Sequence, residues 1–168
     1  MSQTFDSIFK QDVKRIHYQI DVLDSNKSHI HVVIWPTFSG LSDFEKSVAD
    51  QIAAFGFSVT AIDLYGQDKN PVALDEKRAK MGALLAEAEP LHALQHQLTQ
   101  SACDGMQTKT IVHVGFCLGG RLALEAGLHF EGSAGAASFH GLMSFFRAQS
   151  EDKANTKAKL LVLNGHQD

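Results

Sequence analysis

Cys117 has the sequence context of a catalytic nucleophile. It lies in the segment Gly115–Gly120 (Gly-Phe-Cys-Leu-Gly-Gly), between a β-rich run at residues 110–114 and a helix-like run at residues 121–129. The order strand, Gly-x-nucleophile-x-Gly, helix is typical of a nucleophile elbow, a tight turn that lifts a reactive side chain clear of a sheet. The start of the next helix carries partial positive charge and free N–H groups, which favour a thiolate and a developing oxyanion. A buried structural cysteine is the alternative, but the flanking glycines favour the nucleophile.

Two backbone N–H groups are expected to form an oxyanion hole beside this cysteine. One belongs to Leu118, the residue after the nucleophile. The other is expected from the loop after the β-rich run Ile30–Trp35, at Phe38 or Thr37. Taken alone, this loop is more typical of an ordinary glycine-containing turn, and only the neighbouring elbow makes the oxyanion role competitive.

Asp168 is the candidate acid of a catalytic triad. It follows the apolar run at residues 159–164 and Gly165. Triad hydrolases hold the carboxylate that orients their histidine at the end of a sheet strand, and in this fold class it follows the nucleophile in the chain. The spacing alone favours a solvated aspartate over a triad member.

No histidine is an obvious general base for Cys117. His140 follows the β-rich run at residues 134–139 and could face the site, whereas His166 is only close to the candidate acid in sequence. His113 lies inside an expected strand, where a packed or paired role is favoured. Because a base must reach the sulfur and be held by an acid, none of the three is assigned.

Other candidate residues are expected to have structural or solvated roles. His92 and His96 have the i,i+4 spacing of metal ligands on a helix, but without a third ligand a solvated helix face is favoured and no metal site is predicted. Arg78 and Lys80 lie where a substrate carboxylate could be met, although a solvated helix charge is favoured. Cys103 is expected to be structural.

The composition is that of an ordinary globular protein. The 168 residues are 44% hydrophobic and 20% charged, with a net charge of −4. No basic cluster is present, so neither nucleic acid nor an anionic membrane is an expected partner. No apolar run has the length of a membrane span and the first residues lack a signal-peptide core. With two cysteines, one of them on the elbow, a reducing cytoplasmic location is expected.

The elements that position these residues alternate along the chain. Ser42 and Glu45 are typical of a capping box that starts a helix, on which Phe44, Val48, Ile52 and Phe55 recur at helical spacing. Pro90 is expected to split a second helical stretch at residues 74–100. Further β-rich runs alternate with these helices, which predicts an α/β fold whose doubly wound, mostly parallel sheet has helices on both faces. The β-rich runs are residues 30–35, 57–64, 110–114, 134–139 and 159–164.

Four segments together resemble the dienelactone hydrolase family of α/β-hydrolases. They are Gly115–Gly120, Asp63–Gly66, Ser138–Gly141 and Gly165–Asp168, and the resemblance runs from about residue 30 to the last residue. It implies a Cys-His-Asp triad that hydrolyses lactones or small esters without a metal or organic cofactor. Carried over, Cys117 is similar to the family nucleophile and Asp168 to the triad acid. Thr37, Tyr65, Arg78 and His140 become candidates for the substrate pocket.

Two departures from the family pattern are visible. Many members carry a glutamate in the loop after the first long strand, and Thr37 occupies that position here. The family histidine follows its aspartate by several tens of residues, whereas this sequence stops at Asp168. We therefore expect residues 1–168 to form a single α/β-hydrolase domain that is incomplete at its C-terminus, with a strand and a helix missing. Such a domain would expose an apolar face through which it could oligomerise.

Two other functions remain open from the sequence. The Gly-x-Cys-x-Gly segment also occurs in glutamine amidotransferase-like and redox-responsive thiol proteins, although the Asp63–Gly66 and Gly165–Asp168 segments argue against them. The chain is otherwise an incomplete or inactive hydrolase fragment.

Overall fold

The computed structural model describes residues 8–9, 12–23, 26–27, 29–104, 110–143 and 157–165. Its centre is a six-stranded sheet with the strand order β1-β3-β2-β4-β5-β6. The β1 strand is antiparallel to β3, and every other neighbouring pair is parallel. The strands are β1 (Tyr18–Ile20), β2 (Ile30–Trp35), β3 (Ser58–Ala61), β4 (Thr110–Phe116), β5 (Ser133–Phe139) and β6 (Lys159–Leu163). The helices are α1 (Asp43–Ala54), α2 (Leu74–Leu84), α3 (Ala88–Cys103) and α4 (Leu118–His129).

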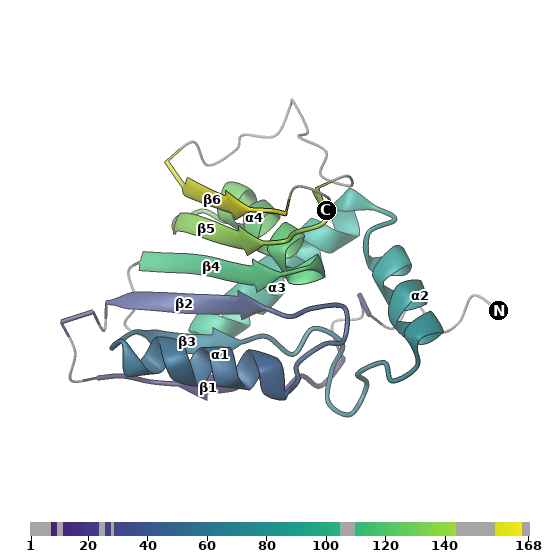
Figure 1. Cartoon of the computed structure of the whole chain (residues 1–168), viewed down its shortest axis with the longest axis horizontal. Coiled ribbons are helices and arrows are strands. Elements are labelled where there is room, and N and C mark those ends of the chain that lie inside the picture. Colours follow the sequence, from purple (N-terminus) through teal and green to yellow (C-terminus); the bar gives the residue numbers. More distant parts are fainter. Residues whose placement is uncertain are drawn as a thin grey trace.

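Helices cover both faces of this sheet, as the alternating pattern predicted (Figure 1). Successive strand residues point to opposite faces, so the central strand β2 supplies both cores. Val33 and Trp35 pack with residues of α3 and α4, whereas Val32 and Ile34 pack with residues of α1. The α2 helix lies beyond the carboxyl ends of the parallel strands (Figure 1). Among the described residues, no helix is long and apolar enough to cross a membrane.

The α1 helix starts as predicted, and the middle of its expected apolar stripe, Val48 and Ile52, packs against the core. Ser42 is its N-cap, and the reciprocal capping box with Glu45 is formed. The expected apolar stripe is wrong at both ends, because Phe44 is 48% exposed and Phe55 is 71% exposed. Ala49 is fully buried against the sheet, where its small side chain lets the helix approach closely.

The helical stretch at residues 74–100 is split as expected, although not at its proline. The break falls between α2 and α3, and Pro90 lies in the first turn of α3. Proline is tolerated in a first turn because its missing N–H has no intrahelical acceptor there.

The β6 strand forms an open edge of the described sheet. Its four apolar residues Leu160, Leu161, Val162 and Leu163 remain 45% to 51% exposed. Leu160 lies near Gly127 of α4, so the α4 side of this strand is partly covered. On the opposite side the described helix α1 contacts β1, β2 and β3.

Candidate active site

Cys117 occupies a strained turn between the end of β4 and the start of α4. Its backbone has φ 55° and ψ −120°, a conformation that costs a non-glycine residue free energy and is concentrated at functional sites. Two hydrogen bonds hold the turn: the Cys117 N–H donates to the Phe139 carbonyl at 3.1 Å, and the Gly120 N–H donates to the Cys117 carbonyl at 3.0 Å. The residue is half-buried and its thiol is free. The predicted strand–elbow–helix geometry is therefore formed.

The glycines on either side of Cys117 are required by close backbone approach. A Cβ atom on Gly115 would collide with the carbonyl group of Gly119. A Cβ atom on Gly119 would collide with the carbonyl groups of Trp35 and Pro36. The first turn of α4 thus lies directly against the loop that follows β2, as an oxyanion hole built from both segments requires.

The structure separates the two candidate donors of the β2–α1 loop. The Thr37 N–H donates to Glu45 Oε1 at 3.0 Å and is therefore occupied. The Phe38 N–H has no acceptor among the described residues. Leu118 is the first residue of α4, so its N–H has no intrahelical acceptor. Phe38 and Leu118 are the pair available to an oxyanion.

Glu45 has a role in this loop that sequence spacing did not reveal. Its side chain is 1% exposed, and it also accepts hydrogen bonds from the N–H and hydroxyl groups of Ser42. The capping box predicted only the contact with Ser42. The contact with Thr37 depends on how the loop folds back over α1, and no residue pattern signals it.

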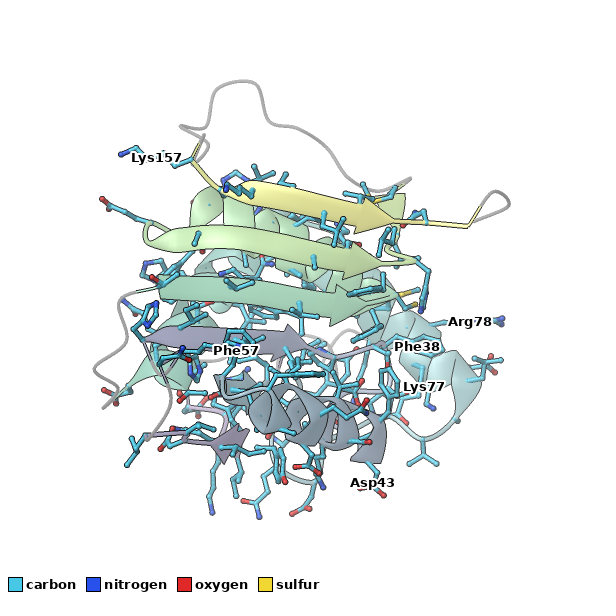
Figure 2. All side chains as sticks on the ribbon, turned by 60° about the vertical axis from the view of Figure 1, so that its left-hand side comes forward. Phe38, Asp43, Phe57, Lys77, Arg78 and Lys157 are labelled. Atoms are coloured by element: carbon cyan, nitrogen blue, oxygen red, sulfur yellow. The ribbon has the colours of Figure 1, made fainter. Side chains whose placement is uncertain are left out.

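Tyr65 fixes the same loop from the other side. Its side chain is buried, and its hydroxyl donates to the Phe38 carbonyl at 3.2 Å. Burial raises the pKa of the Tyr65 phenol far above its usual range, so it acts as a neutral donor. Lys80 Nζ lies 5.3 Å from the Tyr65 ring centroid, and Lys77 Nζ lies 5.7 Å from that of Phe38. Figure 2 shows Lys77 and Phe38 side by side at the carboxyl edge of the sheet.

The remaining predicted pocket residues are Arg78 on α2 and His140 after β5. Arg78 is exposed on α2 and its side chain points outward (Figure 2). His140 is exposed, has φ 43°, and donates its N–H to the Leu163 carbonyl at 2.7 Å. His140 directly follows Phe139 of β5, and Cys117 directly follows Phe116 of β4. Phe139 and Phe116 are register partners. No hydrogen bond links the His140 imidazole to Cys117 within the described residues.

His113 is paired and buried, as expected for a strand histidine. Its Nδ1 accepts from Trp35 Nε1 at 3.1 Å, and its Nε2 lies 2.7 Å from the Ser133 hydroxyl. Desolvation, together with the nearby His31, lowers the pKa of His113 to about 3. Both ring nitrogens are thus engaged, which excludes His113 as the base for Cys117.

Asp168 and His166 lie outside the described residues, so the triad acid and base remain predictions. Cys103 is half-buried, and desolvation raises the pKa of its thiol to about 11, which favours a structural role. His92 and His96 lie on α3, and no group of three or more His, Cys, Asp or Glu among the described residues has an arrangement that could hold a metal.

Comparison with known proteins identifies the family and the fold of the chain. The sequence model of the dienelactone hydrolase family matches residues 22–168. No curated protein matches the chain. A solved structure named m3DLH is 21% identical to this chain, with a TM-score of 0.78. The match covers 92% of this chain and 70% of the m3DLH chain. A dienelactone hydrolase-like promiscuous phosphotriesterase from metagenomic libraries is 19% identical, with a TM-score of 0.76 over the same shares.

These structural likenesses establish an α/β-hydrolase fold, and the family match extends over most of the sequence. The chain belongs to the dienelactone hydrolase family of ester and lactone hydrolases.

Proposed function

We propose that this protein hydrolyses small carboxylic esters or lactones with Cys117 as its nucleophile. The observation that carries the proposal is the strained backbone of Cys117, which sets the thiol at the start of α4 beside the loop after β2. Its two cysteines are unpaired, which supports a cytoplasmic site of action.

Catalysis would begin with attack of the Cys117 thiolate on the substrate carbonyl carbon. The N–H groups of Leu118 and Phe38 would stabilise the negative oxygen of the tetrahedral intermediate. The carbon–oxygen bond to the leaving alcohol then breaks, the alcohol takes a proton from a histidine, and a thioester remains on the sulfur. A water molecule then gives a proton to the same histidine and hydrolyses the thioester, which releases the acid.

The rest of the machinery is part of the same proposal. Asp168 would orient that histidine, by the family pattern. Thr37, Tyr65 and His140 would border the substrate because they follow the carboxyl ends of β2, β3 and β5, and Arg78 would approach it from α2. No observation favours the glutamine amidotransferase-like or redox alternatives.

Replacing Cys117 with alanine is expected to lower kcat/KM for small aryl esters and lactones by about 10³-fold or more, because the covalent route is removed. Cys103→Ala is the matched control and should retain the wild-type rate, since Cys103 is half-buried at the end of α3. Mass spectrometry after mixing with an aryl acetate should find one acetyl group on Cys117 of the wild type and none in Cys117→Ala.

Two results would count against the proposal. Equal turnover by the wild type and Cys117→Ala would exclude the thiol nucleophile. A wild-type chain that neither turns over these substrates nor becomes acetylated at Cys117 would show that the elbow is not competent for acyl transfer.

A further inference from the structure

The side chain of Glu45 is a buried carboxylate that holds two separate parts of the β2–α1 loop. Glu45 is the third residue of α1 and is only 1% exposed. Its Oε2 atom accepts from the Ser42 N–H at 2.9 Å and from the Ser42 hydroxyl at 2.5 Å. Its Oε1 atom accepts from the Thr37 N–H at 3.0 Å. Each carboxylate oxygen therefore has its own partner, one at the helix start and one at the other end of the loop.

Helix capping explains only one of these two contacts. A capping box needs the third helical residue to accept from the N-cap N–H, which is the contact between Oε2 and Ser42. Burying a carboxylate costs free energy unless its oxygens are hydrogen-bonded. Among the described residues, no lysine, arginine or histidine forms an ion pair with Glu45. The N–H and hydroxyl donors hold the carboxylate in place, and the contact with Thr37 has a role beyond capping.

Three hydrogen bonds fix the backbone groups on either side of the Phe38 N–H. Glu45 holds the Thr37 N–H. The Thr37 carbonyl accepts from the Gly40 N–H at 3.0 Å, and the Phe38 carbonyl accepts from the Tyr65 hydroxyl at 3.2 Å. Because the Thr37 carbonyl and the Phe38 N–H belong to one trans peptide, they point in opposite directions. A Thr37 carbonyl held inside the turn therefore directs the Phe38 N–H out of it.

We propose that Glu45 is a positioning residue for the oxyanion hole, because its hydrogen bond to the Thr37 N–H fixes the direction of the Phe38 N–H. This role rests on the proposed hydrolysis by the Cys117 thiol. Donors that are aligned beforehand need no reorganisation when negative charge develops on the substrate oxygen. Glu45 does not touch the substrate and acts only through the loop.

Two reactions of the Cys117 thiol separate this role from a general effect on folding. Attack on an aryl acetate places negative charge on the carbonyl oxygen, so this reaction uses the oxyanion hole. In alkylation by iodoacetamide the sulfur bonds to a saturated carbon and iodide leaves, so no oxyanion develops. Both reactions need the thiolate. The ratio of the acylation rate to the alkylation rate of Cys117, measured by mass spectrometry at one pH, therefore reports on the oxyanion hole.

Glu45→Ala removes both contacts and should lower this ratio by about ten-fold or more, because the Phe38 N–H loses its alignment. Glu45→Asp keeps the negative charge at the start of α1 but is one methylene shorter. It does not span both Ser42 and Thr37, so it should lower the ratio too. Ser42→Ala is the matched control, since it removes the hydroxyl of the N-cap and leaves the contact between Glu45 and Thr37. It should lower the stability of the chain but keep the ratio within about two-fold of the wild type.

The positioning role is refuted if both Glu45 variants keep the wild-type ratio. It is also refuted if Ser42→Ala lowers the ratio as much as Glu45→Ala does, because loss of the cap would then explain the effect. If neither Glu45 variant shows a cooperative urea transition, Glu45 is a structural residue and the role is likewise refuted. A wild type that is not acylated at Cys117 would remove the proposed hydrolysis itself, whereas an acylated wild type with unchanged variants removes only the role of Glu45.

Discussion

At the scale of single residues, the proposed chemistry depends on one strained backbone position and on the space around it. Cys117 keeps φ 55° because hydrogen bonds to Phe139 and Gly120 hold both sides of the turn. That conformation costs of order 1–3 kcal/mol, which the surrounding packing must offset. The packing is tight because the residues that flank the elbow have no side chains.

Gly119→Ala is expected to lower the free energy of unfolding by about 2 kcal/mol or more, because its Cβ would collide with the carbonyl groups of Trp35 and Pro36. The same collision would push the loop after β2 away from the elbow, so hydrolysis should fall as well. Gly82→Ala is the matched control, because a Cβ atom there meets nothing within 4 Å and Gly82 lies inside α2. It should be neutral or stabilising by up to about 1 kcal/mol. Urea unfolding curves of the three proteins measure both effects, and equal midpoints for Gly119→Ala and the wild type would contradict the argument.

The site was predictable from sequence where the cause is local. The Gly-x-Cys-x-Gly spacing encodes the elbow itself, since neighbouring residues in the chain create the crowding. The choice between Thr37 and Phe38 was not predictable, because it depends on the buried Glu45 carboxylate occupying the Thr37 N–H. A pattern of residue types does not reveal which backbone N–H a side chain will reach.

At the scale of elements, a series of hydrogen bonds through His113 links strands β2, β4 and β5 to α4. Because Nδ1 accepts from Trp35, the proton lies on Nε2, which donates to the Ser133 hydroxyl; Ser133 in turn donates to the Ala126 carbonyl at 3.4 Å. The network needs a neutral imidazole. Nearby, burial lowers the pKa of His31 to about 4.

These two histidines predict a loss of stability in mild acid. Their folded pKa values, about 3 for His113 and about 4 for His31, lie below the ordinary value of 6.5. The unfolded chain therefore binds more protons below pH 6.5, so stability is fully present above that pH and is lost as the pH falls towards 4 and 3. Each histidine adds up to about 1.4 kcal/mol per pH unit to the slope in this window.

His113→Gln isolates one of these contributions. The variant should be less stable at pH 7.5, because an amide replaces the ring poorly, but its stability should depend less on pH between 6.5 and 5 by about 1 kcal/mol per unit. His29→Gln is the control, since it makes the same substitution at an exposed histidine. Urea unfolding at a series of pH values provides the measurement, and parallel pH profiles for wild type and His113→Gln would refute the assignment.

The elements themselves were largely predictable, and the errors have physical causes. The β-rich run Ile30–Trp35 coincides with β2, because parallel strands buried on both faces need continuous apolar residues. The apolar stripe predicted for α1 is wrong at Phe44. This side chain packs edge-on against Phe116, with 5.1 Å between the ring centroids, and does not enter the core. Helical spacing identifies a face but not the sheet residues that will meet it.

At the scale of the whole molecule, the burial of the strands differs between the centre of the described sheet and its β6 edge. The β2 strand is buried on both faces, whereas all residues of β6 are exposed. Leu161 and Leu163 share the face that lies away from α4, and their register partners there are Ala137 and Phe139, with Phe139 stacked on Phe116 at 5.0 Å. The parallel direction of the strands was predictable from the alternation of strands and helices, but the strand order and the exposure of this face were not, because they depend on where each helix crosses the sheet.

The open β6 edge predicts that the chain of 168 residues self-associates. Unpaired backbone groups and exposed apolar side chains on an edge strand favour pairing with another strand, and lysine on such an edge opposes it. The double variant Leu161→Lys/Leu163→Lys should therefore shift the chain towards monomer, as sedimentation velocity at several protein concentrations would show. Phe55→Lys is the matched control. At 71% exposed, Phe55 is more exposed than Leu161 and Leu163, but it lies at the end of α1, away from β6. A monomeric wild type at about 100 μM, or equal dissociation by Phe55→Lys, would show that β6 is not the contact.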